Sequence, residues 1–188
     1  MKATDQKLPV LSLCDYTGVM VQPWPDAGHD AVIVDVQHRE GSRMTGWSDH
    51  YEPSGRGMLT RLGMDVRDWQ EQGTEWAAVF AFPPCTHLAK SGARWWKDKG
   101  LTALIEALQV VDACRQICEA SGAPYMIENP SGALSTHWRK PDYAFDRGRP
   151  SRARITDAIA ICDSMKMHKL TDAEQKLYWT GSAWIQQP

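Results

Sequence analysis

Short apolar runs alternate with polar, glycine-containing segments as far as residue 130, and five of these runs predict buried strands. The predicted strands lie at residues 8–13, 31–36, around 62–64, 76–82 and 123–128. The segment 101–121 carries Leu104, Leu108, Val111 and Cys118 near one face and predicts an amphipathic helix that ends at Gly122. Strands that alternate with helical segments predict an α/β fold, with a mostly parallel sheet and helices on both faces.

The first crossover between strands is interrupted by prolines. Residues 19–27 have helical spacing but contain Pro23 and Pro25, so we expect a short helix, or one that begins at a proline, closed by Gly28. Further polar segments predict loops at 39–57 and 86–100. Short helices are expected at 155–165 and 171–177, and Thr171 with Glu174 fits a capping box at the start of the second.

Composition narrows the class of protein. A chain of 188 residues suits one domain, and its net charge of −2 gives no overall positive field for nucleic acid, so such binding would depend on local patches. Five cysteines, an odd number, and the absence of a signal-peptide pattern favour a reducing cytoplasm. No apolar run approaches the roughly 20 residues that span a bilayer, so we expect no membrane segment.

Chemically capable side chains follow all five predicted strands. In parallel α/β sheets ligands bind beyond the carboxyl ends of the strands, and one edge of the sheet would therefore gather these residues. They are Asp15, Asp35, Asp65, Cys85 and Glu128.

Asp35 suits a ribose. It follows the second strand 20 residues after Asp15, the placement of a carboxylate that binds the two ribose hydroxyls. Only Gly18 lies in the first turn, which argues against a pyrophosphate and for a nucleoside cofactor without phosphates. The alternative is a helix cap or a solvated strand end.

Cys85 follows two prolines, which stiffen the chain and direct the thiol into the crevice. The alternative is a buried structural cysteine, as we expect for Cys114, Cys118 and Cys162. Cys85 and His87 lack a second pair of zinc ligands, so we expect no metal, and His87 is poorly spaced to act as base for the thiol. Glu128 ends the next strand, where a partly desolvated acid can donate to a ring nitrogen. A thiol and an acid at neighbouring strand ends suit activation of a pyrimidine.

In this order the motifs resemble those of cytosine-C5 methyltransferases, and most closely those of short methylase-like proteins of bacteriophages. The likeness covers roughly residues 9–146 and rests on the joint order of LSLCDYTGVMVQPW, Asp35, GMDVRDW, FPPCTH, SGARWW, MIENP and STHWRKPDYAFD. After Asp146 the chain leaves little room for a base-reading region. The arginine that would hold the cytosine oxygen stays open among Arg149, Arg152 and Arg154.

The resemblance implies a Rossmann-like fold that takes S-adenosylmethionine and methylates C5 of cytosine, in DNA or a nucleotide, through a Cys85 adduct. Residues 1–146 would form the catalytic domain, and 147–188 a divergent C-terminal extension packed on it. The implied setting is the cytoplasm of a bacterium or a phage-infected host cell, with a homo-oligomer or a partner subunit possible. The implied catalytic residues are Cys85, Glu128 and Asn129; the cofactor-binding residues are Asp15, Tyr16, Thr17, Gly18, Asp35, Asp65 and Pro83; the substrate-binding residues are Pro84, Arg94 and Arg139.

Two other functions remain open. Cys85 and Glu128 would keep their roles in a C5-pyrimidine modification that uses a different one-carbon donor. Alternatively, the chain is a non-catalytic methylase-like protein that binds nucleic acid, with the basic segment 147–154 and Arg139-Lys140 on phosphates.

Overall fold

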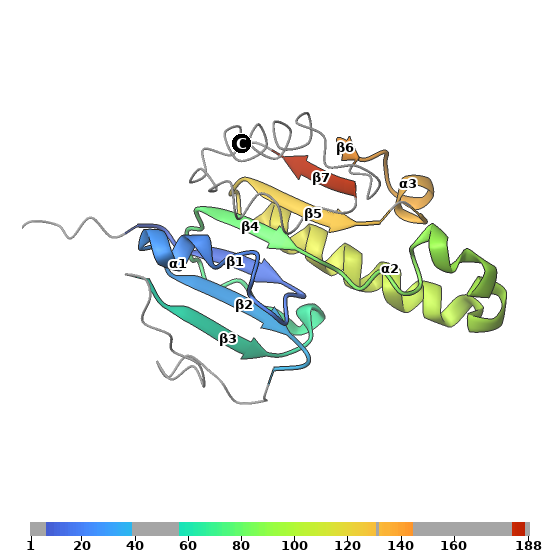
Figure 1. Cartoon of the computed structure of the whole chain (residues 1–188), viewed down its shortest axis with the longest axis horizontal. Helices are drawn as coiled ribbons and strands as arrows, with labels where there is room; N and C mark the ends of the chain where they lie inside the picture. The colour runs from blue at the N-terminus through green and yellow to red at the C-terminus, as the bar shows by residue number, and fades with distance from the viewer. Residues whose placement is uncertain (1–6, 39–56, 131, 145–181, 187–188) are drawn as a thin grey trace, which may run out of the picture.

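One twisted sheet organises the computed structural model, which describes residues 7–38, 57–130, 132–144 and 182–186 (Figure 1). Its strands follow the order β3-β2-β1-β4-β5-β7-β6 in the described residues. The strands are β1 (Val10–Leu13), β2 (Ala31–Asp35), β3 (Leu59–Gly63), β4 (Ala78–Ala81), β5 (Tyr125–Asn129), β6 (Tyr143–Ala144) and β7 (Ser182–Gln186). The helices are α1 (Pro23–Ala27), α2 (Trp96–Ala120) and α3 (Leu134–His137), with 3-10 turns η1 (Val66–Asp68) and η2 (Lys90–Trp95).

The strands β1 to β5 run parallel, and β7 is antiparallel to both β5 and β6. The parallel part has the Rossmann-like order 3-2-1-4-5. The reversed β7 separates β5 from β6, which distinguishes this sheet from the usual dinucleotide-binding order. The predicted α/β class, a mostly parallel Rossmann-like sheet with helices on both faces, is confirmed.

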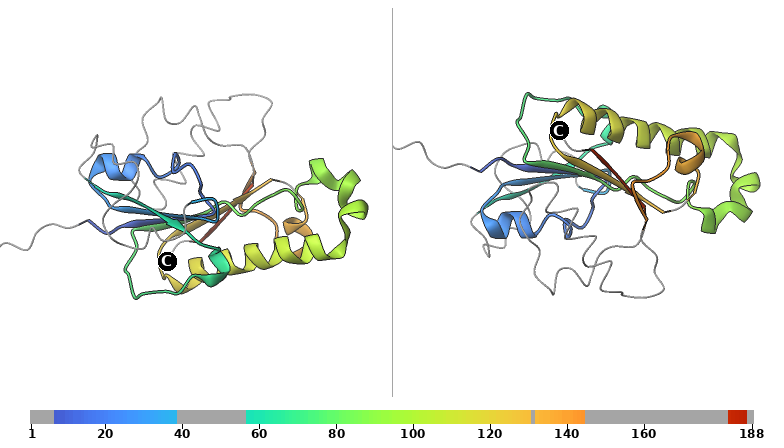
Figure 2. Two further views of the ribbon diagram at one scale, coloured as in Figure 1. Left: turned by 90° about the horizontal axis from the view of Figure 1, so that it is seen from below. Right: turned by 90° about the horizontal axis from the view of Figure 1, so that it is seen from above.

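Two apolar cores lie on the two faces of the sheet, because successive side chains of a strand alternate between faces. Leu11 and Leu13 of β1 belong to the core beneath α2, whereas Val10 packs with Trp24 of α1. Figure 2 shows α1 and α2 on opposite sides of the sheet. Because β1 is the central strand of the parallel part and is fully buried, its end is held from both faces.

The helix α1 is as short as its prolines predict. Pro23 and Pro25 lie in its first turn, where a missing N–H costs nothing, and Gly28 ends the helix with a left-handed backbone. The crossover from β1 to β2 therefore covers its face of the sheet with one turn and the buried ring of Trp24.

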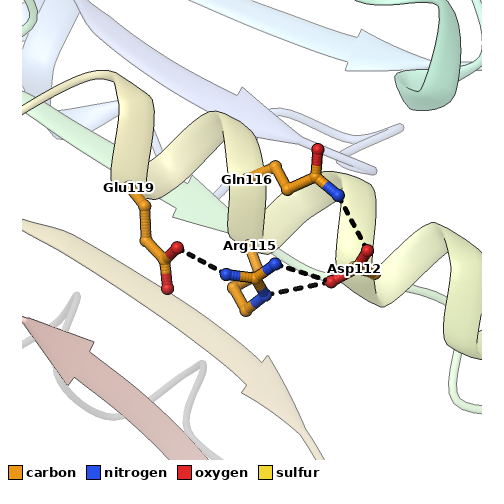
Figure 3. A network of polar contacts seen from close by, with 4 residues as sticks. All are labelled: Asp112, Arg115, Gln116 and Glu119. Carbon is orange, nitrogen blue, oxygen red and sulfur yellow. Dashed lines mark hydrogen bonds and ion pairs between the residues drawn. The ribbon is translucent and has the colours of Figure 1, made fainter.

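The helix α2 is longer than expected and is broken at Gly100, whose backbone is not helical. After the break it buries Val111, Cys114 and Cys118 against the sheet, as the periodicity predicts. Its outer face carries a polar network in which the Arg115 guanidinium donates to Asp112 (2.8 Å) and Glu119 (2.5 Å), and Gln116 donates to Asp112 (Figure 3). Each such pair, three or four residues apart, adds about 0.2–0.5 kcal/mol.

The structure also departs from the pattern-based prediction. The segment 86–100, expected to be a loop, contains η2 and the first turn of α2, and β3 begins upstream of the residues predicted for it. All five residues of β3 are only half-buried at the edge of the sheet. An edge strand of this kind accepts polar residues, so its start is not marked by an apolar run in the sequence. Most of the expected loop at 39–57, both helices expected after residue 154, Cys162 and the basic segment 147–154 lie outside the described residues. In the described part, no helix is long and apolar enough to cross a membrane.

Phe80 provides a test of the core beneath α1. Its ring is 1% exposed and packs 5.1 Å from that of Trp24. We expect Phe80→Ala to lower the free energy of unfolding by about 3–5 kcal/mol through loss of buried area and a residual cavity. Urea denaturation measures this, and Leu101→Ala, at a 70% exposed position on α2, should change it by less than about 0.5 kcal/mol. Equal effects of the two substitutions would contradict the assignment of this core.

Candidate functional site

The carboxyl ends of β1 to β5 meet at one edge of the sheet (Figure 1). Asp15, Asp65 and Cys85 follow β1, β3 and β4, whereas Asp35 and Glu128 lie at the end of β2 and β5 themselves. The chain moves from β1 to β2 and β3 on one side and returns to β4 on the other side of β1. Such a reversal of strand order is where α/β sheets bind ligands. The ends of β1 and β4 are therefore the centre of the candidate site.

Asp15 organises the turn that follows β1. Its Oδ1 accepts hydrogen bonds from the Gly18 amide (2.8 Å) and the Thr17 hydroxyl (3.4 Å), and its Oδ2 accepts one from Ser12 (2.9 Å). The carboxylate is 6% exposed, and Gly18 completes the turn with a φ of 71° that disfavours other residues. Both oxygens of Asp15 thus hold the chain's own turn.

Asp35 is more open than Asp15. It is half-buried at the end of β2, and its Oδ1 accepts a hydrogen bond from the Gln37 amide (2.8 Å). Its Oδ2 accepts no hydrogen bond from the described residues. Val36 and Tyr16, each next to one of the two strand-end carboxylates, are 64% and 54% exposed. This part of the edge combines an available carboxylate oxygen with exposed apolar surface.

Asp65 is paired with a neighbour. It caps η1 by accepting from the Arg67 amide, and the Arg67 guanidinium donates to both carboxylate oxygens at 2.9 and 2.5 Å. These hydrogen bonds from the Arg67 side chain are the main reason that the pKa of Asp65 lies below its ordinary value. A second partner for this carboxylate would have to compete with Arg67.

Cys85 begins a tight turn immediately after the two prolines. Pro83 is buried and Pro84 exposed, and the thiol of Cys85 is half-buried and free of any disulfide. The carbonyl oxygen of Cys85 accepts from the amides of Leu88 and Ala89, both at 2.9 Å. The backbone of this turn is therefore fixed on the side that leads to η2.

Asn129 ties the turn of Cys85 to β5. Register pairing of β4 with β5 ends at Ala81 and Ile127, and its continuation by two positions places Pro83 opposite Asn129. Pro83 has no N–H, and instead its carbonyl oxygen accepts a 2.8 Å hydrogen bond from Nδ2 of Asn129. Asn129 is fully buried, and its Oδ1 has no partner among the described residues. Its side chain positions the backbone ahead of Cys85.

A second connection joins the segments that follow β4 and β5 further along the chain. The Leu88 carbonyl accepts from the Ala133 amide at 2.8 Å, and Ala89 forms a bridge with Gly132. A Cβ on Gly132 would overlap the carbonyl oxygen of Leu88, so this close approach requires glycine. The segments after β4 and after β5 are thus joined at two levels.

Glu128 lies one residue before Asn129. It is half-buried in β5 and pairs in register with Ala183 of β7. Because β4 and β5 are neighbouring parallel strands, the structure brings Glu128 to the same edge as Cys85.

The two arginines expected to bind substrate lie on different segments. Arg94 in η2 is exposed, and its guanidinium lies 4.9 Å from the ring of Trp95, which is 50% exposed. Arg139 follows α3, forms an ion pair with Asp142 at 2.8 Å and lies over the ring of Trp138. Arg94 is thus open to solvent, whereas Arg139 already has a carboxylate partner.

His87 is half-buried beside a cavity of about 280 Å³ that is otherwise lined by the first part of α2, and its Nδ1 has no hydrogen-bond partner among the described residues. Within the described ranges no group of three or more His, Cys, Asp or Glu side chains is arranged to hold a metal ion.

Three contributors to the site were not expected from the sequence: Ser12, His38 and Gly132. His38 is buried, with Nε2 2.9 Å from the carbonyl oxygen of Tyr16 and Nδ1 3.3 Å from that of Leu62, so its ring lies between the turn after β1 and the end of β3. Its partners are more than 20 residues away along the chain, so no local pattern points to it. The Pro-Ser-Gly sequence at 130–132 marks a turn, and this is the one signal that could have indicated Gly132.

Gly132→Ala tests the connection between the two turns. The added methyl group must displace the Leu88 backbone, and we expect the free energy of unfolding to fall by about 1–3 kcal/mol. Gly92→Ala is the matched control, because a Cβ there meets only the Thr86 carbonyl oxygen at 3.6 Å. Urea denaturation of both variants decides the point, and an equally stable Gly132→Ala would refute the close approach.

The ion pair of Asp65 predicts a small pH dependence. A carboxyl with a lowered folded-state pKa stabilises the fold above its unfolded pKa, and this contribution disappears as the pH falls through the folded value. The side chains of the pair are partly exposed, so solvent screening keeps this contribution small. We expect Arg67→Met to return the pKa of Asp65 toward its ordinary value of 3.8, as followed by carboxyl NMR. Arg115→Met should leave it unchanged, and an unaltered titration in Arg67→Met would contradict the assigned cause.

Comparison with known proteins adds little to this geometry. No protein-family model matches the chain, and no curated protein matches it. Among solved structures it is similar to one described as a DNA modification methyltransferase encoded within an E. coli prophage, with 15% identity and a TM-score of 0.36 over 68% of this chain. The chain spans about a third of that structure, 33%. It is also similar to the methyltransferase domain of bacterial CtHen1, with 12% identity and a TM-score of 0.39 over 94% of this chain and 87% of that domain. With both TM-scores below 0.5, the description of the fold rests on the sheet topology itself.

Proposed function

We propose that this chain transfers a methyl group from S-adenosylmethionine to C5 of cytosine, with Cys85 as the nucleophile. The observation that carries the proposal is the joining of the β4 and β5 ends, where the Asn129 side chain holds the Pro83 carbonyl and so sets Cys85 beside the strand that carries Glu128. A thiol and a carboxyl held on neighbouring strand ends can act on two positions of one pyrimidine ring. The motif order described above supplies the identity of the reaction.

The β1 to β3 half of the edge fits a nucleoside cofactor. Asp35 presents an oxygen that can accept from a ribose hydroxyl, and exposed Tyr16 and Val36 offer apolar surface for a purine. Asp15 contributes indirectly, by shaping the turn through Gly18. Asp65 is available to an adenine amine only if Arg67 yields one of its hydrogen bonds.

The roles of the residues follow from this placement. The Cys85 thiolate adds to C6 of cytosine, and Glu128 hydrogen-bonds N3 and so accommodates the electron density that moves into the ring. S-adenosylmethionine supplies the methyl group for C5. Loss of the C5 proton to solvent then allows the bond between C6 and the Cys85 sulfur to break, which restores the thiolate and the aromatic ring. Asn129 and Pro83 keep the Cys85 backbone in place throughout.

A nucleic acid with an unstacked target base is the proposed substrate, and a cytosine nucleotide is the smaller alternative. Cytosine in a duplex is inaccessible to a thiol unless it is flipped out. The exposed ring of Trp95, with Arg94 over it, offers a stacking surface ten residues after Cys85, and exposed Lys90 and Lys97 flank it. Pro84 and Arg139 remain proposed substrate contacts.

The described part of the C-terminal extension supports a single catalytic unit. We propose that residues 1–146 form the methyltransferase-like domain and that 147–188 packs on it, because β7 of the extension pairs with β5 along its whole length. The Glu128 strand then has neighbours on both sides.

A different one-carbon donor is the second candidate. Asp15 and Asp65 already have partners within the chain, which leaves Asp35 as the one strand-end acid of β1 to β3 with an oxygen that accepts no hydrogen bond from the described residues. In this case Cys85 and Glu128 keep their roles, and S-adenosylmethionine does not bind.

Cys85→Ser should abolish methyl transfer by more than about 1,000-fold, since a hydroxyl at neutral pH is a far weaker nucleophile than a thiolate. Transfer of a labelled methyl group to single-stranded and duplex DNA and to dCMP measures the loss. Cys118→Ala, which removes a buried thiol of α2, should keep activity within about threefold. DNA that contains 5-fluorocytosine should trap the wild-type chain covalently, because fluorine cannot leave C5 as a proton does. Methyl transfer that survives in Cys85→Ser would refute the role of this residue.

Asp35→Ala should weaken binding of S-adenosylmethionine by about 10–100-fold, the range expected for loss of a charged hydrogen-bond acceptor. Calorimetric titration of wild-type and variant measures the effect. Asp26→Asn, an exposed carboxyl on α1 toward the opposite edge of the sheet, should bind as the wild type does. Binding that is unchanged in Asp35→Ala would place the cofactor elsewhere, and no binding by the wild type would favour the second candidate.

A further inference from the structure

Two cysteines that the proposed reaction does not use lie in contact beneath the carboxyl edge. The sulfur atoms of Cys14 and Cys114 are 3.8 Å apart, although the residues are 100 positions apart in sequence. Cys14 follows β1 and is half-buried, and Cys114 is fully buried on the sheet-facing side of α2. The contact therefore connects the end of the central strand to the long helix.

The backbone of Cys14 is unusual. Its φ of 55° is the one positive value at a non-glycine position in the described ranges. This left-handed conformation is disfavoured for a residue with a Cβ and persists when the surroundings hold it in place. It carries the chain from β1 into the turn of Asp15 while the Cys14 sulfur stays against α2.

We infer that Cys14 and Cys114 form a reversible disulfide when the protein meets a low-molecular-weight disulfide such as oxidised glutathione. The half-exposed Cys14 thiolate attacks glutathione disulfide, forms a mixed disulfide and releases one glutathione thiolate. Cys114 then loses its proton to solvent, attacks the Cys14 sulfur and displaces the second glutathione. Two cysteine thiols are oxidised and one glutathione disulfide is reduced to two thiols, so electrons and atoms balance.

The second step is the slower one. In the reduced protein the hydrogen bond with Cys14 and then burial are the main causes that raise the pKa of Cys114. Burial still acts on Cys114 after Cys14 has formed the mixed disulfide. The thiol is therefore protonated at neutral pH, and the rate of ring closure should rise by about tenfold per pH unit below this pKa. Cys118, one turn further along α2, is also buried, but its sulfur forms no contact with that of Cys14 that would permit the same exchange.

Closure of the disulfide should change the adjoining turn. The two sulfurs must approach from 3.8 Å to a bond of about 2.05 Å, which draws the end of β1 toward α2. Asp15 is the next residue and holds Gly18, so the turn assigned to the cofactor moves with Cys14. This consequence, unlike the disulfide itself, rests on the proposed function.

The experiment treats the whole chain with oxidised glutathione in mildly alkaline buffer, blocks the remaining thiols and maps the peptides by mass spectrometry. We expect a Cys14–Cys114 linkage, reversed by dithiothreitol, and a higher melting temperature because a long loop is closed. Cys118→Ser should form the same linkage, and Cys114→Ser should stop at one glutathione on Cys14. A linkage through another cysteine, or a wild type that stays at the mixed disulfide, would overturn the inference.

Calorimetry separates the two proposals. If the reduced chain binds S-adenosylmethionine, the oxidised chain should bind it at least several-fold more weakly and recover after reduction. Unchanged affinity in a chain with a mapped disulfide would overturn the effect on the turn. If the reduced chain binds no S-adenosylmethionine, the proposed function fails, while the mapped linkage still decides the inference about the thiols.

Discussion

The hydrogen bond from the Asn129 side chain to the Pro83 carbonyl sets the geometry on which the candidate site depends. Two prolines before Cys85 end the hydrogen-bond ladder of β4, since neither can donate to a neighbouring strand. The buried amide of Asn129 connects the two segments again, two positions beyond the last paired residues of the register. Without it, the Pro83 carbonyl would be left unsatisfied in the interior, at a cost of about 1–3 kcal/mol. The same prolines that stiffen the turn of Cys85 thus create the need for Asn129.

The strand ends could be predicted from the sequence because they combine two strong local signals. Buried parallel strands are continuous apolar runs, and Cys85 and Glu128 stand close to the ends of such runs. The partners of those residues could not be predicted in the same way. His38, Ser12 and Gly132 act through contacts that the tertiary fold creates, and the half-buried edge strand β3 has too mixed a composition to mark its own limits.

The three predicted acids of the β1 to β3 half are chemically different in the folded protein. Sequence places Asp15, Asp35 and Asp65 at equivalent strand ends, but Asp15 is enclosed by its own turn and Asp65 is bound to Arg67. What separates them is burial and neighbouring donors, neither of which is visible from strand position. The availability of Asp35 follows from its single backbone partner on one oxygen.

The antiparallel strand β7 has a consequence for how the chain is made. Strand β5 is complete once residue 129 has been synthesised, but its second neighbour, Ser182–Gln186, emerges from the ribosome more than 50 residues later. Until then the strand that carries Glu128 and Asn129 has a bare edge, and β6 has no strand to join, because it pairs with β7. Unpaired strand edges invite association with other chains. The nascent protein thus passes through an interval in which one strand of its future site is open to pairing with another chain.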